Sequence, residues 1–204
     1  MKRTKQEAQE TKKAILQSAL NTFYEKGYSK TTFEEIASNI GLTKGAVYWY
    51  FKNKPDLLTA LINEYIEAKK QYLAIKVPTL NHFKDIRNYF LYSVDFILSD
   101  EKYLKSAFFF CLQMEWSETI ITKILEEAKE TKEYFCRQMI GCLTSMQKNG
   151  EIRDDMDVEL ISSIIINIWT GNLEAYLSKR CTVDLKEMIE KSFDLLLNGL
   201  QKKG

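Results

Sequence analysis

The 204-residue chain contains one histidine, two prolines, eight glycines and four cysteines. Because His82 is the only histidine, neither a His-rich zinc site nor a Ser-His-Asp triad can be completed without it. It stands in the first turn of an expected helix, after a proline, so a surface or capping role is favoured. This inventory excludes most metal-centred all-α enzymes, and we expect no enzyme, no catalytic residue, no metal and no cofactor.

The four cysteines, at positions 111, 136, 142 and 181, form no CxxC pair and no zinc spacing. Free, buried and inert thiols are therefore favoured, with a redox sensor as the alternative. No apolar run approaches the roughly 18 residues needed to cross a bilayer, and the polar N-terminus has no signal-peptide core. We therefore expect a cytoplasmic protein.

Glycine, proline and runs of alternating apolar and polar residues are scarce, so nothing in the sequence indicates a sheet. Hydrophobic residues make up 45% and charged residues 28% of the chain, as in ordinary globular proteins. Apolar residues recur at three- and four-residue steps through most of the sequence, which is the spacing of helices with one buried face. The fold class predicted from this pattern is all-α.

Residues 31–51 have the pattern of a helix-turn-helix. Thr31 and Thr32 each have a glutamate three residues later, so either can begin a helix with a capping box. Apolar residues follow at helical spacing, Gly41 allows the turn, and Thr43 can cap a short second helix that is basic and aromatic. This arrangement is typical of a helix placed in the major groove of DNA. The alternative is an ordinary helical hairpin with a solvated basic face.

We expect Lys44 of the second helix to read a base edge, whereas Lys54 and the hydroxyl groups around the helix are expected to contact phosphates. The expected DNA-binding residues are Thr31, Thr32, Thr43, Lys44, Gly45, Ala46, Tyr48, Trp49, Tyr50 and Lys54.

Charge is distributed unevenly along the chain. Up to Pro55 there are ten basic and five acidic residues, a net charge of +5, whereas the rest carries nineteen and twenty-three, a net charge of −4. A solvated basic tail explains the lysines before residue 14 but not Lys44, Lys52 and Lys54. The basic N-terminal part therefore has the charge expected of a nucleic-acid-binding head.

The segment AILQSALNTFYEKGYSKTTFEEIASNIGLTKGAVYWYFKNKPDLL, residues 14–58, resembles the DNA-binding head of the TetR family of bacterial transcriptional repressors without a gap. RTKQEAQETKKAIL, KGAVYWYFKNKPDL and the C-terminal VDLKEMIEKSFDLLL resemble AcrR-type regulators of multidrug efflux pumps in particular. One departure is Tyr50, where many members have histidine; a tyrosine hydroxyl can still donate to a phosphate.

The resemblance implies an N-terminal three-helix DNA-binding head, joined by a long fourth helix to a C-terminal ligand-binding and dimerisation body of about nine helices in all. We expect the domains to be 9–69 and 70–204. From apolar spacing and stop signals, the helices after the head are expected near residues 54–75, 80–98, 103–111, 117–148, 158–178 and 185–202.

An effector pocket is expected among the fourth to eighth helices, again from the resemblance. Aromatic side chains near a carboxylate suit a flat, apolar ligand and also allow a cationic one. The alternative is that these are core residues with a solvated glutamate. The expected pocket residues are Glu64, Glu67, Phe108, Phe109, Met114, Glu115 and Trp116.

The last two helices carry apolar residues over more than one face, so they must be buried on more than one side. Burial within one chain would explain this, but the resemblance implies pairing with a second subunit as a four-helix bundle. The expected dimer interface is Ile161, Ile165, Trp169, Leu173, Tyr176, Ile189, Phe193 and Leu196.

These expectations combine into one function: a homodimeric, sequence-specific repressor that leaves a palindromic operator when a small effector binds. The resemblance implies that it controls a multidrug efflux pump. The partners would be double-stranded DNA, a second copy of the chain and an unidentified small molecule, without a membrane. The alternative is a DNA-binding regulator that answers to a protein partner or has no small-molecule effector.

Overall fold

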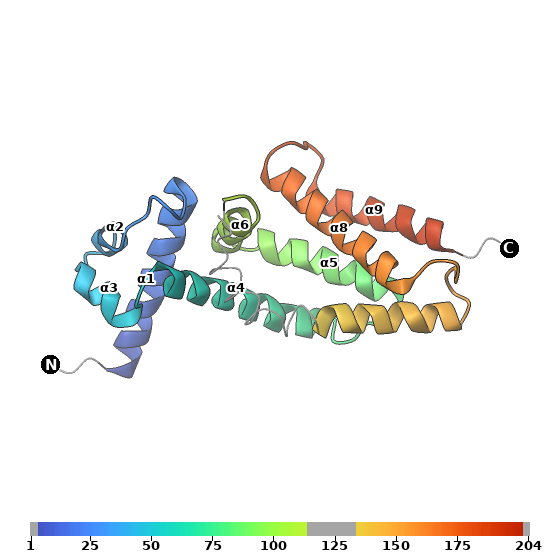
Figure 1. Cartoon of the computed structure of the whole chain (residues 1–204), viewed down its shortest axis with the longest axis horizontal. Helices are drawn as coiled ribbons and strands as arrows, with labels where there is room; N and C mark the ends of the chain where they lie inside the picture. Colours follow the sequence, from blue (N-terminus) through green and yellow to red (C-terminus); the bar gives the residue numbers. More distant parts are fainter. Residues whose placement is uncertain (1–3, 114–133, 202–204) are drawn as a thin grey trace. The chain divides into compact units, whose positions relative to one another are not determined.

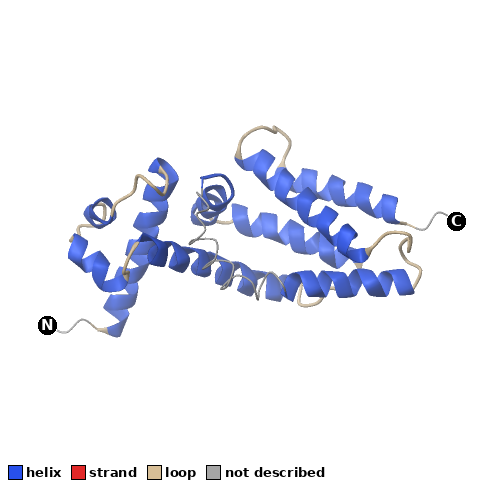
Figure 2. Cartoon of the chain, viewed as in Figure 1, coloured by secondary structure: helices blue, strands red, loops and turns tan. Residues whose placement is uncertain are grey.

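The computed structural model describes residues 4–113 and 134–201. Within these ranges every regular element is helical and no strand occurs, as Figure 2 shows, which confirms the all-α prediction. A helix over residues 134–148 precedes α8. The other elements, labelled in part in Figure 1, are α1 (Lys5–Lys26), α2 (Phe33–Ser38), α3 (Lys44–Tyr50), α4 (Lys54–Lys76), α5 (Phe83–Leu98), α6 (Glu101–Phe108), the π-helix η1 (Phe109–Gln113), α8 (Val158–Leu177) and α9 (Leu185–Leu200).

The chain forms two compact units. Of the described residues, the first holds 4–67 and 99–113, and therefore α1 to α3, the N-terminal part of α4, α6 and η1. The second holds 68–98 and 134–201, and therefore the C-terminal part of α4, α5, the helix 134–148, α8 and α9. None of the helices in the described ranges is both long enough and apolar enough to cross a membrane.

Side-chain caps determine where the helices of the first unit begin. Thr4 and Glu7 form a capping box at α1, and Thr32 and Glu35 form one at α2. Of the two registers offered by the adjacent threonines, the second is therefore used. The chain leaves α1 at Gly27, where φ is 83°, a left-handed backbone that glycine adopts without strain.

The core of the first unit is built from the inward faces of α1, α2, α3 and α4. The fully buried apolar side chains on these four helices are Ile15, Ala19, Leu20, Phe23, Ile36, Val47, Leu57 and Leu58. Because α3 is only seven residues long, it depends on this packing rather than on its own hydrogen bonds for stability.

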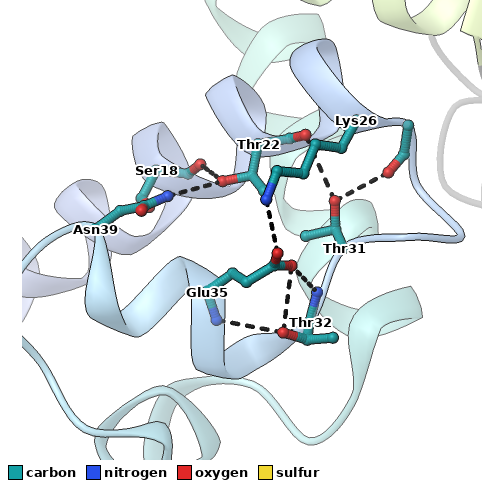
Figure 3. A network of polar contacts seen from close by, with 8 residues as sticks. Ser18, Thr22, Lys26, Thr31, Thr32, Glu35 and Asn39 are labelled. Atoms are coloured by element: carbon teal, nitrogen blue, oxygen red, sulfur yellow. Dashed lines mark hydrogen bonds and ion pairs between the residues drawn. The ribbon is translucent and has the colours of Figure 1, made fainter.

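A network of polar contacts fixes α2 against α1 (Figure 3). The Ser18 hydroxyl donates to the Ile36 carbonyl oxygen at 2.9 Å, and the Asn39 amide donates to the Thr22 hydroxyl at 3.2 Å. The Lys26 amine donates to Glu35 at 2.7 Å. Because the Ser18 and Thr22 side chains are buried, these bonds also satisfy polar groups that would otherwise be costly inside the protein.

The second unit is held together by α5, α8 and α9. Phe90 of α5 lies with its ring centroid 5.3 Å from both Trp169 of α8 and Phe193 of α9. Arg87 of α5 reaches α9, where its guanidinium donates to Glu190 at 2.5 Å. Before α5, the backbone N–H of His82 donates to Asp85 at 2.9 Å, so this residue lies at the start of the helix.

Candidate DNA-binding site

The turn between α2 and α3 has the compact form that the sequence predicts. Gly41 has a φ of 67°, and the Leu42 N–H donates to the Ala37 carbonyl oxygen at 2.9 Å. The Thr43 hydroxyl then accepts a hydrogen bond from the Ala46 N–H at 3.3 Å and so caps α3. The inward side of α3 is anchored by Val47, which is fully buried.

The outward side of α3 is open to solvent. Lys44, Gly45, Tyr48 and Trp49 are exposed, and the Tyr48 and Trp49 side chains have exposed fractions of 50% and 74%. At about 100° per residue these four positions fall within an arc of roughly 140°, so together they cover the side of the helix away from the core. An exposed face that combines an amine, two aromatic rings and a residue without a side chain suits close contact with a large polar partner better than contact with water.

Lys44 is not isolated on this face. Its amine forms an ion pair with the Glu34 carboxylate of α2 and lies 5.7 Å from the centre of the Tyr48 ring. The hydrogen bond between the pair lowers the pKa of Glu34 and raises the pKa of Lys44. Both side chains are well exposed, so the pair orients the lysine rather than adding much stability. The pairing of Glu34 with Lys44 could not be predicted from the sequence, because it depends on the angle between α2 and α3.

Lys54, expected at a phosphate, is engaged inside the head. Its amine donates to the carbonyl oxygens of Tyr28 and Ser29 at 2.8 and 3.1 Å and lies 4.7 Å from the centre of the Tyr28 ring. It therefore ties the start of α4 to the loop after α1. A role at DNA would be additional to this structural one.

The two threonines before α2 differ in position. Thr31 is only 1% exposed, and its hydroxyl donates to the Gly27 carbonyl oxygen at 2.9 Å. We therefore withdraw Thr31 from the DNA-binding set, because its side chain faces the protein interior. Thr32 is exposed but uses its hydroxyl as the cap of α2.

At the end of α3, the Tyr50 hydroxyl is buried and has no hydrogen-bond partner among the described residues. Its ring meets the Trp49 ring edge-on, with centroids 4.6 Å apart. The expectation that this hydroxyl contacts a phosphate would require the side chain to turn outward. Ala46 lies half-buried on the same helix.

Residues 15–61, which include the whole helix-turn-helix, match the family model described as bacterial regulatory proteins, tetR family. The chain therefore contains a DNA-binding domain of the TetR family. It is a DNA-binding transcriptional regulator and not an enzyme.

Relatives extend this similarity beyond the head. Over 203 residues the chain is 26% identical to the HTH-type transcriptional repressor BepR of Brucella suis, covering 98% of this chain and 91% of BepR. Native NalD of Pseudomonas aeruginosa, the secondary repressor of the MexAB-OprM multidrug efflux pump, has a similar fold with a TM-score of 0.80 at 23% identity; the match covers 97% of this chain and 100% of NalD. SmeT of Stenotrophomonas maltophilia, in its triclosan complex, matches with a TM-score of 0.74 at 25% identity, covering 96% of this chain and 93% of SmeT.

Of the residues expected at an effector pocket, the four that lie in the described part of the chain do not form one group. Glu64 is paired with Lys102, whereas Glu67 is exposed. Phe109 is fully buried with its ring stacked 5.3 Å from Phe23, so it belongs to the core of the first unit. Phe108 is half-buried and meets the Tyr24 ring edge-on at 5.0 Å. Met114, Glu115 and Trp116 lie outside the described residues.

The residues expected at the dimer interface lie mostly inside a single chain. Ile161, Ile165, Ile189 and Phe193 are fully buried and Leu173 is 6% exposed, so we withdraw these five from the interface. The physical reason is that the most apolar side of α8 and α9 packs within its own unit. Trp169, Tyr176 and Leu196 are half-buried.

Other residues form the accessible apolar side of α8 and α9. Leu160 is 52% exposed and Leu195 is 74% exposed, while Ile164 is half-buried. Gly171 and Gly199 are exposed further along the same helices, and in neither would an added Cβ meet any atom within 4 Å. Helical spacing places Leu160 on the same side of α8 as Gly171 and Leu195 on the same side of α9 as Gly199, but it does not distinguish this side from the buried one.

All four cysteines are free thiols. Burial raises the pKa of Cys142 to about 11, which keeps this thiol protonated and unreactive near neutral pH. Cys111 is exposed, and Cys181 lies with its sulfur 3.3 Å from the sulfur of Met188.

Proposed function

We propose that the chain is a homodimeric repressor that holds a palindromic operator through two copies of α3 and leaves it when a small apolar effector binds the C-terminal body. The effectors that we propose include cationic ones. The proposed domains are 9–69 for DNA binding and 70–204 for ligand binding and dimerisation. The observation that carries the proposal is the exposed face of Lys44, Tyr48 and Trp49, on a helix that is capped and buried on its other side.

The proposed dimer uses the accessible apolar side of α8 and α9. Leu160 and Leu195 are large aliphatic side chains that would be covered by a second copy, and the exposed Gly171 and Gly199 would allow helices to approach closely. A two-fold axis would then place the recognition helices about 34 Å apart or somewhat more, one for each half of an inverted repeat.

Control of a multidrug efflux pump is the biological role that we propose. NalD is a repressor of such a pump, and SmeT represses another and has been solved with triclosan. For the effector site, Glu64, Glu67 and Phe108 remain candidates within the described residues. Such a repressor would act in the cytoplasm, where the chromosome is.

The test begins with selection of bound sequences from a random pool of double-stranded DNA. We expect an inverted repeat to be enriched; binding without enrichment would contradict the proposal. The enriched operator is then titrated with the full-length protein in the presence of triclosan and of a lipophilic cation such as tetraphenylphosphonium. A thermal shift together with release of the operator supports a small-molecule effector.

If neither compound causes a thermal shift while the operator still binds, the alternative of a regulator without a small-molecule effector is favoured. A regulator of that kind would answer to a protein partner or to none. The DNA-binding half of the proposal would then stand, and the effector half would fall.

A further inference from the structure

The recognition face of α3 has an unusually restricted set of side chains. The helix sequence is KGAVYWY, which contains one lysine and no arginine, asparagine, glutamine, aspartate or glutamate. Its exposed side chains are those of Lys44, Tyr48 and Trp49. The Thr43 hydroxyl beside them is already the cap of the helix.

Each base in the major groove is read by a particular chemistry. Adenine edges are read by amide side chains and cytosine edges by carboxylates, whereas guanine edges accept from basic side chains and thymine presents a methyl group to apolar ones. Because α3 has neither amide nor carboxylate side chains, it has no strong reader for adenine or cytosine. It has one reader for guanine and two large apolar surfaces for thymine.

The contacts of these side chains hold them in place for this task. The Tyr48 ring is supported by Phe33 at 4.9 Å, and the Trp49 ring is supported edge-on by Tyr50 at 4.6 Å. Lys44 is oriented by its pair with Glu34. Supported aromatic rings lose little conformational entropy on binding, so less of the free energy of their contacts with a partner is offset by ordering the side chains.

Gly45 supplies an independent observation. A Cβ added there would meet only the Thr43 hydroxyl oxygen, at 3.9 Å, which is an ordinary contact. No positive φ requires glycine at this position either. Nothing within the described chain explains the missing side chain, whereas a partner approaching the exposed backbone beside Trp49 would explain it.

We propose that α3 reads each half-site through thymine methyl groups, which Tyr48 and Trp49 cover, next to a guanine edge that Lys44 reads. The operator would therefore contain a guanine beside a cluster of thymines in each half. This inference rests on the proposed function, because it assumes that α3 lies in the major groove.

The first experiment changes only the DNA, so the fold of the protein is not disturbed. In the operator enriched by the wild-type protein, each thymine is replaced in turn by deoxyuridine, which removes the methyl group and keeps base pairing. We expect each contacted methyl to weaken binding about fourfold, the effect of exposing one buried methyl group. Replacing the contacted guanine by 7-deazaguanine should also weaken binding, and deoxyuridine in the flanking sequence should change nothing.

The second experiment assigns the methyl groups to a side chain. Trp49→Ala should weaken operator binding and should also abolish the effect of deoxyuridine at the thymines that Trp49 covers, because the contact is already lost. Ile75→Ala is the matched control: Ile75 is an 81% exposed apolar residue of α4, and its removal should leave both affinity and deoxyuridine sensitivity unchanged.

Two results would overturn the inference while leaving the proposed function intact. One is an operator whose affinity is unaffected by deoxyuridine at every thymine of the half-site. The other is a Trp49→Ala protein that loses affinity equally for all sequences and keeps full deoxyuridine sensitivity, which would place Trp49 against the sugar-phosphate backbone. Failure to enrich any sequence would instead overturn the proposed function itself.

Discussion

The exposed face of α3 and the accessible side of α8 and α9 both present large apolar side chains to solvent, but their surroundings differ. On α3, Trp49 lies beside a lysine and at the surface of a basic head. On α9, Leu195 is equally exposed, at 74%, but is accompanied by Gly199 and lies in the acidic part of the chain. The first surface suits a polyanion with apolar groups on it, and the second suits another apolar helix.

The comparison shows that exposure alone does not identify a partner. An indole can stack on or cover a base and still tolerate water, whereas an aliphatic side chain gains only from being covered by other apolar atoms. The following substitutions test whether the two surfaces are as separate as this contrast implies, beginning with the largest expected effect.

Phe193→Ala tests which side of α9 is core. Phe193 is fully buried and its ring lies 5.3 Å from Phe90, so we expect the free energy of unfolding to fall by about 3–5 kcal/mol. Urea unfolding measures this, with Ile75→Ala as an exposed control that should change it by less than about 0.5 kcal/mol. A Phe193→Ala protein of normal stability that no longer dimerises would return Phe193 to the interface.

Leu195→Asp tests the other side of the same helix. A carboxylate at this position is solvated in one chain but would be buried without a partner in the proposed dimer, so we expect dimerisation to weaken by about 2–3 kcal/mol. Sedimentation equilibrium gives the dissociation constant, and Ile75→Asp, at another exposed apolar residue, should leave it unchanged. If both variants had the same dimer dissociation constant as wild type, this surface would not be the dimer interface.

Lys44→Ala tests the cation of the α3 face. Loss of a side chain that reads a base edge should weaken binding to the selected operator about ten- to a hundredfold, with a smaller loss on random DNA. Fluorescence anisotropy with both DNAs separates the two effects. Equal losses on operator and random DNA would assign Lys44 to a phosphate.

Lys54→Ala tests a residue that the sequence placed at DNA and the structure places within the head. Two carbonyl oxygens, of Tyr28 and Ser29, lose a charged donor, so we expect the free energy of unfolding to fall by about 1–2 kcal/mol. If Lys54 also contacts a phosphate, binding should weaken alike on all sequences. The slope of the logarithm of the binding constant against the logarithm of the salt concentration should then become less steep by about one unit. A protein of unchanged stability would show that these two hydrogen bonds contribute nothing measurable.

Glu34→Gln has the smallest expected effect. Removing the carboxylate beside Lys44 removes a negative charge near the DNA, so affinity for operator and random DNA alike should rise about two- to fivefold. The pKa of Glu34 is lowered, so the ion pair is complete above the ordinary carboxyl value of 4.5 and is lost only as the pH falls through the lowered pKa. The gain should therefore be constant from pH 6 to pH 8, as anisotropy titrations would show. Weaker binding would mean that the orientation that Glu34 gives to Lys44 outweighs the repulsion between its carboxylate and the DNA.

Local signals were enough to predict the head from the sequence. Thr43 and Gly41 determine the start of α3 and the turn before it through contacts within a few residues, and such contacts can be read from spacing. Thr31 shows the limit, because two adjacent threonines offered the same local motif and only packing against α1 decided between them.

The partner-facing surfaces were harder to predict. Ile161 and Ile189 are strongly apolar, which predicts an interface, yet the same property buries them inside their own chain. Helical spacing does not distinguish the apolar side that packs within the chain from one that is covered by a partner. For the same reason, spacing does not single out Leu160 and Leu195, which we propose for the interface. The pairing of Lys44 with Glu34 joins two helices across a turn, so its geometry is tertiary and no spacing rule reveals it.

The most direct test of the account compares the two surfaces in one titration. Affinities of wild type and Leu195→Asp are measured for the selected inverted repeat and for a DNA of the same length that holds a single half-site. We predict that wild type strongly prefers the inverted repeat, whereas the folded Leu195→Asp protein binds both DNAs with the same, weaker affinity. If folded Leu195→Asp bound the inverted repeat as tightly as wild type, the α8 and α9 surface would not be what joins two recognition helices.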